Sequence, residues 1–447
     1  MNEYTLDSSY LKQPPVRLKG MFLHIGPSII LTASIVGSGE LIMTTTLGAK
    51  AGFTALWVIL VSCLFKVAIQ LEFGKHAISS GETTMQSFNA LPGPRWKGIS
   101  WTVLAWICIK GLQLIQYGGI IGSVALVLKL AFPDVDVWIW VIIASITTYL
   151  LVFKGHYRHI ERTAIILTAA FSLFTIFCVI ALQSTPYSIS LSQLGEGLNF
   201  RLPASIIGVA LAAFGLTGVS ADEIISYPYW CLEKGYARYT GKREPTTEWV
   251  NRAKGWIRVM YLDAALSMTI YTIVTAAFYI LGAAILFERG EIPAGYDLII
   301  ILSNIYTEST GQWALAVFMV GAIVTLFSTL FVACASGTRM FTDAFAQCRL
   351  LDFYNPVQRS RWIRNLSWIL PLIWAILFLC IRAPVLMVMA GGLSLMLLLA
   401  LVVYAAWFFR YRRLGKDLKP GPIYDILLWI SIFAIAAVGL ISVFNLW

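Results

Sequence analysis

Apolar runs of about 20 residues recur along almost the whole chain, and this is the length that a helix needs to cross the hydrocarbon core of a bilayer. Only 13% of the 447 residues are charged, about half the roughly 25% of a soluble domain. This composition excludes a water-soluble fold and predicts one polytopic, all-α membrane protein. We expect eleven spans, at approximately 24–50, 52–73, 99–131, 136–153, 160–182, 203–230, 257–287, 313–340, 365–381, 384–409 and 422–445.

The Lys and Arg residues are distributed unevenly between the segments that connect these spans. If the N-terminus is cytoplasmic, most of the 33 Lys and Arg residues lie in cytoplasmic segments. The opposite side holds only Lys50, Lys129, Arg201, Arg289 and Arg382. The positive-inside rule therefore predicts a cytoplasmic N-terminus and an outward C-terminus. Because topology accounts for the net charge of +10, we expect a lipid bilayer around the chain and no nucleic-acid partner.

Two of the predicted spans carry glycine and serine in their middle, each followed by acidic residues. Residues 37–40 read Gly-Ser-Gly-Glu, and residues 218–223 read Gly-Val-Ser-Ala-Asp-Glu. Glycine costs about 1 kcal/mol of helix propensity relative to alanine, so both stretches favour unwinding. Unwound backbone inside a membrane is tolerated only where it is buried in protein or lines a wet cavity. We therefore predict that helices 1 and 6 are broken at these two places.

Interrupted helices at corresponding places in two halves indicate an inverted-repeat transporter with its substrate site at the midplane. The breaks lie five spans apart, and because five is odd the second repeat enters the membrane from the opposite side. The predicted organisation is a cytoplasmic N-terminal segment at 1–23, a first five-helix repeat at 24–182, a second, inverted repeat at 203–409, and an additional helix 11 at 422–447.

Acidic residues follow both breaks, where freed carbonyls and half-helix ends come together. An acid near the bilayer centre costs at least ~2.5 kcal/mol, which makes each one a functional candidate. We expect Glu40 and Asp222 to bind the substrate and Glu223 to add charge or to gate. Residues next to them complete the predicted site, namely Gly37, Ser38, Gly39, Val219 and Ser220. By contrast, we expect the lysines within spans, Lys66 and Lys110, to snorkel toward the membrane surface.

Several short motifs follow one another along the first eight spans. They are Gly26-Pro27, FTALWVIL at 53–60, AIQLEFGKHAISSG at 68–81, Tyr157-Arg158-His159-Ile160-Glu161-Arg162, Asp263-Ala264-Ala265, and Ser328-Thr329-Leu330 with Gly337-Thr338. Their order and spacing resemble the Nramp family of divalent metal transporters. This resemblance implies the amino-acid-transporter (LeuT) type of 5+5 inverted repeat, and transport across a membrane. The chain has no phosphate loop, nucleophile triad or redox motif, so we do not expect an enzyme.

The functional motifs of that family are altered in this chain. Where the family has Asp-Pro-Gly-Asn in helix 1, its Asp falls on Gly37 and its Asn on Glu40. Where the family has Met-Pro-His in helix 6, this chain has Val219-Ser220-Ala221. The acids that the family places in helix 3 fall near Gln116 and Gly119. The resemblance therefore implies a site without the metal-binding thioether and without the family's proton pathway.

Loss of the thioether and gain of Glu40 shift the predicted site from soft to hard ligands, which suit Mg²⁺ and Mn²⁺. The family includes a magnesium-transporting branch without proton coupling, and this chain is nearest to it in character. We therefore predict a secondary transporter of a hard divalent cation, without proton coupling and without a bound cofactor. We expect it in a prokaryotic cytoplasmic membrane. The oligomeric state is left open, with a monomer favoured.

Two other functions remain open at this stage. Gly37-Ser38-Gly39 is similar to the helix-1 stretch of amino-acid transporters on the same scaffold, where backbone amides bind a substrate carboxylate. The alternative is therefore transport of an amino acid or small organic amine, and a further one is a sensor that no longer transports. Glu161 in a basic loop and Asp263 at the start of the seventh span are candidate gating residues.

Overall fold

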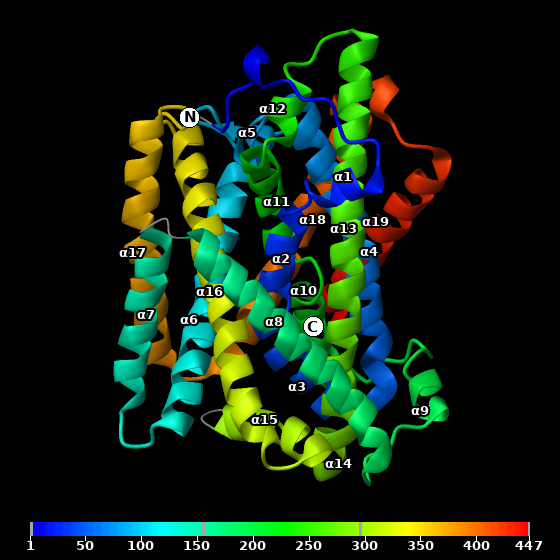
Figure 1. Ribbon diagram of the computed structural model, residues 1–447, viewed down its shortest axis with the longest axis vertical. Helices are drawn as coiled ribbons and strands as arrows, with labels where there is room; N and C mark the ends of the chain where they lie inside the picture. The colour runs from blue at the N-terminus through cyan, green and yellow to red at the C-terminus, as the bar shows by residue number, and fades with distance from the viewer. Residues whose placement is uncertain (1–2, 154–156, 295–296, 446–447) are drawn as a thin grey trace.

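The computed structural model describes residues 3–153, 157–294 and 297–445, which form a tall bundle of helices (Figure 1). A two-stranded antiparallel ribbon, β1 (Arg95–Trp96) and β2 (Ile99–Ser100), is the one sheet among these residues. The prediction of an all-α membrane fold is confirmed.

Apolar helices coincide with all eleven predicted spans. Seven helical stretches of the described residues are long and apolar enough to cross a membrane, and one of them, Pro27–Ser80, covers the first two spans. Three shorter apolar helices, Val137–Phe153, Thr168–Ser184 and Pro422–Val438, cover the fourth, fifth and eleventh. The helices of the bundle are α2 (Pro27–Ile35), α3 (Thr45–Ala51), α4 (Leu56–Ser80), α6 (Trp101–Ala131), α7 (Val137–Phe153), α8 (Tyr157–Ala181), α10 (Ile207–Leu216), α11 (Ala221–Lys234), α13 (Thr247–Leu281), α16 (Ala314–Gln347), α17 (Pro356–Ile381), α18 (Pro384–Phe408) and α19 (Pro422–Asn445).

Short helices cover the two ends of the bundle (Figure 1). The end drawn uppermost carries α1 (Leu18–Phe22), α5 (Thr84–Asn89) and α12 (Tyr236–Thr240). The opposite end carries α9 (Leu191–Glu196), α14 (Phe287–Arg289) and α15 (Leu298–Thr310).

The first and sixth spans are broken, as predicted. In the first span, α2 ends at Ile35, Val36 leaves the helical region with ψ 67°, and a π-helical turn at Gly39–Thr44 leads into α3. In the sixth span, α10 ends at Leu216 and α11 begins at Ala221. Gly218 between them has φ +60°, a conformation that glycine adopts without a steric penalty.

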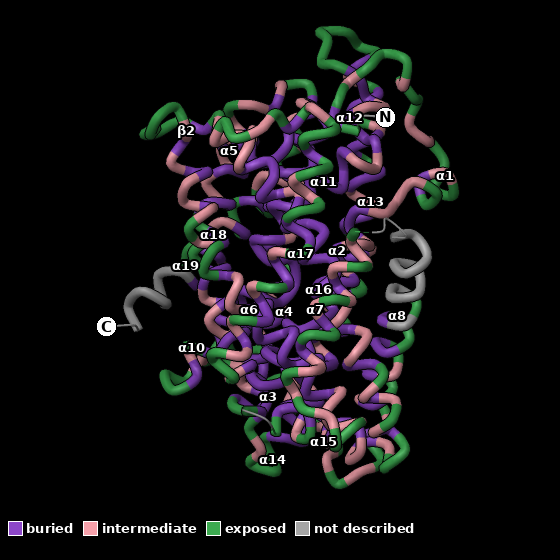
Figure 2. The backbone as a smooth tube through the Cα atoms, turned by 90° about the vertical axis from the view of Figure 1, so that its left-hand side faces the viewer, coloured by how far each residue is buried: buried purple, intermediate pink, exposed green. Residues whose placement is uncertain are grey.

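The broken helices occupy the middle of the bundle. Helix α2 packs against α13 and α16, and α10 packs against α18. Helix α6 runs along α16, α17 and α18, while α19 packs outside on α4 and α18. Buried residues are concentrated along this central axis, and exposed ones gather at the two ends and the periphery (Figure 2). The breaks are therefore enclosed by protein on all sides.

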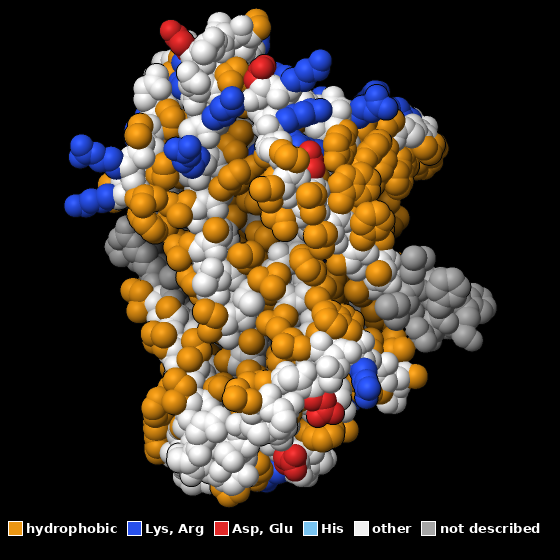
Figure 3. Space-filling model, turned by 90° about the vertical axis from the view of Figure 1, so that its right-hand side faces the viewer, with side chains coloured by type: hydrophobic (Ala, Val, Ile, Leu, Met, Phe, Trp, Pro, Cys, Tyr) orange, Lys and Arg blue, Asp and Glu red, His pale blue; other side chains and the backbone are white. Residues whose placement is uncertain are grey.

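Charge divides the face of the molecule drawn in Figure 3 into three zones. Lys and Arg side chains gather at the end that carries α1, α5 and α12, an apolar band follows, and few charges lie at the far end. The basic end is tied together across the bundle, because Arg339 of α16 pairs with Glu233 of α11 at 2.5 Å. Tyr4 of the N-terminal segment donates to the same carboxylate at 2.5 Å. An apolar band between polar ends is the surface of an integral membrane protein.

Glycine allows two helices to approach backbone to backbone near the far end. A Cβ atom on Gly48 of α3 would lie only 2.5 Å from the backbone oxygen of Tyr279. A Cβ atom on Gly282, in the π-helical turn that continues α13, would lie 2.5 Å from the backbone oxygen of Thr45. Small residues are a common means of close helix packing in membranes.

This contact predicts the effect of a larger residue. We expect Gly48→Val to destabilise the fold by about 1–3 kcal/mol, the usual cost of overpacking a filled core. Thermal unfolding of the detergent-purified protein measures this. Gly111→Ala in α6 is the matched control, because a Cβ there meets nothing within 4 Å. Equal melting temperatures for both variants would contradict the prediction.

Candidate functional site

A small cavity lies where the two helix breaks meet. Its volume is about 20 Å³, room for about one water molecule. The first broken helix contributes Ser34, Ile35, Ser38 and Gly39, and the sixth contributes Leu216, Ser220, Asp222 and Glu223; Gln113, Gln116 and Tyr117 of α6, Thr329 of α16 and Leu395 of α18 complete the wall. The structure thus brings together most of the predicted site residues from both halves of the chain.

Asp222 is the carboxylate with the most elaborate surroundings. It is 6% exposed, and its two oxygens accept hydrogen bonds from the Lys110 ammonium at 2.6 Å and from the Tyr117 hydroxyl at 2.9 Å. Lys110 itself is 1% exposed, so the expectation that it snorkels to the surface is wrong. The ion pair with the Asp222 carboxylate stabilises the Lys110 ammonium in this buried position.

Glu223 is engaged at the start of its own helix. Ser220 is the N-cap of α11 and accepts from the backbone amides of Asp222 and Glu223, while the Glu223 carboxylate accepts from the Ser220 amide at 2.9 Å and from its hydroxyl. Ser-Ala-Asp-Glu is thus a capping box, which was not among the predictions from the sequence. The other Glu223 oxygen accepts from Ser34 across the cavity at 3.3 Å.

Two amide oxygens in the cavity wall have no hydrogen-bond donor. Gln113 Oε1 and Gln116 Oε1 are buried and accept from none of the residues that the structure describes. A buried acceptor without a donor costs free energy comparable to a lost hydrogen bond, roughly 1–3 kcal/mol. The lone pairs of these two oxygens are therefore available to a ligand such as a cation.

Glu40 lies outside the cavity wall. Its side chain is fully buried, and its oxygens accept from the Thr275 hydroxyl of α13 at 3.1 Å and from the Gly37 amide at 3.3 Å. Neither Gly37 nor Val219 lines the cavity. A Cβ on Gly37 would overlap the Thr329 hydroxyl at 1.8 Å, and Val219 is buried at 1% exposure.

Lys66 of α4 binds the sixth span at its break. Its ammonium donates to the backbone oxygens of Phe214 at 2.8 Å and Thr217 at 2.6 Å, both at the C-terminal end of α10. It is fully buried, so the expectation of snorkelling is wrong here too. A cation is stabilised at a helix C-terminus by the freed carbonyls and the helix dipole. Two of the carbonyls that the break frees are thus bound by a side chain.

The two candidate gating residues differ in what the structure tells of them. The Asp263 carboxylate of α13 accepts from the backbone amides of Gly26 at 2.9 Å and Ser28 at 2.7 Å. It therefore satisfies the first amides of α2, a helix distant in sequence. The side chain of Glu161 lies outside the described residues.

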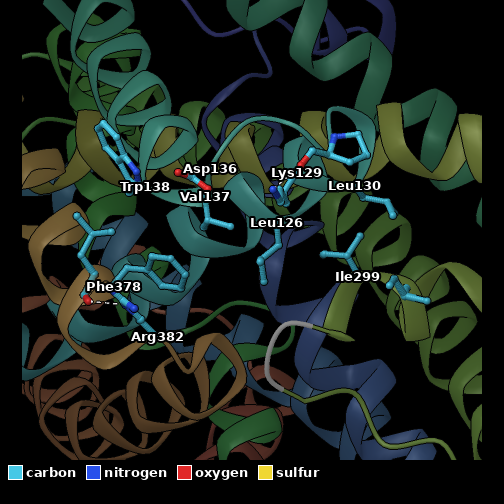
Figure 4. Close-up of a pocket in the computed structure, with 12 residues that line it drawn as sticks. Leu126, Lys129, Leu130, Asp136, Val137, Trp138, Ile299, Phe378 and Arg382 are labelled. Carbon is cyan, nitrogen blue, oxygen red and sulfur yellow. Dashed lines mark hydrogen bonds between the residues drawn. The ribbon is translucent and has the colours of Figure 1, made fainter.

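A much larger cavity, of about 640 Å³, lies at the end that carries α14 and α15. Figure 4 shows Phe378 and Arg382 on one of its walls, with Lys129 and Leu130 on another. None of the predicted site residues lines it. We therefore place the candidate site in the small central cavity, where the titratable groups and helix breaks converge.

Four residues of α6 that lie at or beside the site were not predicted as a group. From the sequence, Lys110 was expected to snorkel, and Gln116 was expected only at the place of a family acid. Gln113, Gln116 and Tyr117 follow Lys110 by three, six and seven positions, so all four share one helix face. Polar side chains on one face of a membrane helix indicate a face turned toward the bundle interior. That periodicity was the available signal.

The fold and the central cavity define a membrane transporter with two broken helices. The chain belongs to the Nramp family, since the family model described as "Natural resistance-associated macrophage protein-like" matches residues 28–445. It is 24% identical over 438 residues to the divalent metal cation transporter MntH of Listeria welshimeri, covering 96% of this chain and 89% of the relative. It is 22% identical over 435 residues to MntH of Staphylococcus aureus, covering 95% and 90%.

Solved structures show the same fold. The Eremococcus coleocola manganese transporter in complex with an aromatic bis-isothiourea compound has a TM-score of 0.69 at 17% identity, covering 98% of this chain and 90% of that one. MhsT in complex with L-phenylalanine has a TM-score of 0.56 at 16% identity, covering 96% and 99%. The predicted LeuT-type fold is confirmed. Membership of the Nramp family makes the protein a membrane transporter and not an enzyme.

The position of Lys66 yields a stability prediction. We expect Lys66→Met to lower the free energy of unfolding by about 1–3 kcal/mol, because it removes a donor from two buried carbonyls. Thermal unfolding in detergent measures the loss. Lys254→Met, at an exposed position of α13, is the matched control and should melt like the wild type. A wild-type melting temperature for Lys66→Met would contradict a structural role for the ammonium.

Proposed function

We propose that this protein transports a hard divalent cation, Mg²⁺ or Mn²⁺, by alternating access around the central cavity. The named relatives, MntH of Listeria welshimeri and of Staphylococcus aureus, are divalent metal cation transporters. Asp222 and Glu223 supply the charge at the cavity, and Ser38 and Ser220 supply neutral oxygens. Glu40 acts from behind the first break, where its carboxyl group accepts from the Gly37 amide and the Thr275 hydroxyl.

The observation that carries this proposal is the chemistry of the cavity wall. Its polar side chains are two carboxylates, two glutamine amides and several hydroxyls, so every side-chain acceptor is oxygen. The buried amide oxygens of Gln113 and Gln116 are without donors among the described residues. Oxygen ligands without sulfur favour Mg²⁺, Ca²⁺ and Mn²⁺ over softer metals.

No three His, Cys, Asp or Glu side chains in the described part of the chain come together as a metal-binding group. A cation would therefore be held by the two carboxylates and by neutral oxygens. The cavity of about 20 Å³ is too small for a hydrated ion. We infer that this state is occluded, and that an ion bound in it exchanges most of its water for protein oxygens.

Transport without proton coupling is the finer part of the proposal. By the resemblance to the family, its helix-3 acids fall near Gln116 and Gly119, and Gln116 is an uncharged residue of the cavity wall. Without a carboxylate relay on α6, the membrane potential drives the ion. It supplies ~4.6 kcal/mol for a doubly charged ion at 100 mV. We propose that the basic end of the bundle faces the cytoplasm, so that the potential drives the ion inward.

The amino-acid alternative is not favoured. The likeness to MhsT extends to the fold alone, at 16% identity. In addition, the cavity wall presents carboxylates and amide oxygens, and a volume of about 20 Å³ is far below that of an amino acid.

Uptake into proteoliposomes tests the proposal. We expect saturable uptake of Mg²⁺ or Mn²⁺ that is driven by an inside-negative potential and moves no protons. Asp222→Asn should reduce uptake by about tenfold or more, because it removes charge at the cavity. Glu40→Gln should reduce it as well, because it replaces one of the two carboxyl oxygens that accept from the Gly37 amide and the Thr275 hydroxyl.

Controls separate binding from folding in this experiment. Each variant is first shown to elute and melt as a folded protein, and Gly111→Ala serves as the unaffected reference. Absence of flux for Mg²⁺, Mn²⁺, Ca²⁺ and Co²⁺ in folded wild-type protein would overturn the proposal. Proton movement in step with the metal would overturn only the statement on coupling.

A further inference from the structure

The central site already contains two cations of its own. Lys110 pairs with Asp222 at 2.6 Å, and Lys66 binds the carbonyls of Phe214 and Thr217. Both lysines are almost fully buried. These ammonium groups therefore already occupy the positions of negative potential that would attract an entering divalent cation.

Lys66 and Lys110 differ in what holds them. Lys66 binds two backbone carbonyls at the fixed end of α10, and no carboxylate lies within hydrogen-bonding distance of it among the described residues. Lys110 binds a side-chain carboxylate of the cavity wall, and its second contact, the Tyr117 hydroxyl, is at 3.5 Å. The ammonium of Lys66 is part of the scaffold, whereas Lys110 shares its acceptor with the proposed substrate.

The charges around the cavity explain why such a pairing is needed. Asp222, which is buried, and Glu223, which is partly buried, are neighbours at the start of α11 and both line the small cavity. Uncompensated carboxylates in this setting repel one another and lose their hydration. A carrier that releases a divalent cation has to compensate this charge before it can return empty through the occluded state.

We propose that the Lys110 ammonium is an exchangeable, built-in counter-ion, which the divalent cation displaces from Asp222 on binding and which returns to Asp222 on release. This rests on the proposed function and adds a role for a residue of α6. Displacement of Lys110 lowers the apparent affinity of the site for metal. The return of Lys110 allows the empty carrier to reorient.

Loss of the Lys110 ammonium should affect two modes of transport differently, whereas loss of a purely structural residue would affect both modes equally. Net uptake into metal-free vesicles requires the empty carrier to return, whereas exchange of external labelled Mn²⁺ for internal Mn²⁺ does not. Without the ammonium, we expect net uptake to fall by about tenfold or more while exchange persists. The concentration of Mn²⁺ that half-saturates exchange should also fall, because no internal cation competes.

The experiment compares wild type, Lys110→Met, Lys110→Gln and Lys110→Arg in proteoliposomes, with Mn²⁺ as the probe in both modes. Lys110→Gln keeps a hydrogen-bond donor toward Asp222 without the charge, so it substitutes for Lys110→Met if that variant does not fold. Lys110→Arg keeps the charge and should retain net uptake. Lys254→Met, an exposed lysine, should behave as the wild type in both modes.

The outcomes distinguish this inference from the proposed function. Selective loss of net uptake in the neutral variants, with rescue by arginine, supports the counter-ion role. Equal loss of both modes, or undiminished net uptake, overturns it while the wild-type flux leaves the proposed function in place. Wild-type protein that neither takes up nor exchanges Mn²⁺, Mg²⁺, Ca²⁺ or Co²⁺ overturns both.

Discussion

The architecture depends on satisfying the backbone groups that two helix breaks free in the middle of a membrane. An amide or carbonyl without a partner costs several kcal/mol where no water reaches it. In the sixth span, Lys66 binds the carbonyls that end α10, and Ser220 with Glu223 caps the amides that begin α11. At the start of α2, Asp263 accepts from two further amides. Charged side chains that would be a liability elsewhere in the bundle thus stabilise it here.

The same groups set the electrostatics of the site. Asp222 lines the cavity and pairs with Lys110. Glu223 also lines the cavity, but one of its oxygens accepts from the Ser220 amide in the cap of α11. The electrostatic potential that attracts a cation is therefore the net effect of several buried groups of opposite charge. Binding strength at such a site depends on which of the internal pairs an ion can replace, and less on the number of acids.

Local signals in the sequence predicted much of the fold. Apolar length indicated the spans, and glycine beside serine indicated both breaks to within a few residues. The pairing of Lys110 with Asp222 could not be predicted in this way, because 112 residues separate them and helix periodicity carries no information on which helices face each other. The side on which Glu40 lies was also not predictable, since the π-helical turn at Gly39–Thr44 turns it toward Thr275 of α13. The Ser-x-x-Glu spacing of the capping box, by contrast, was visible in the sequence.

The long helix α13 runs beside the first broken span and touches it at three levels. Asp263 binds the start of α2, Thr275 donates to Glu40 just beyond the break, and Tyr279 lies against Gly48 of α3. A continuous helix that contacts both halves of an interrupted helix restrains how the two halves lie relative to each other. Either the two halves tilt together with α13 as one lever, or the hydrogen bonds of Asp263 open and release α2 alone. Any movement at the break in the first span therefore depends on its contacts with α13, a helix that has no break at that level.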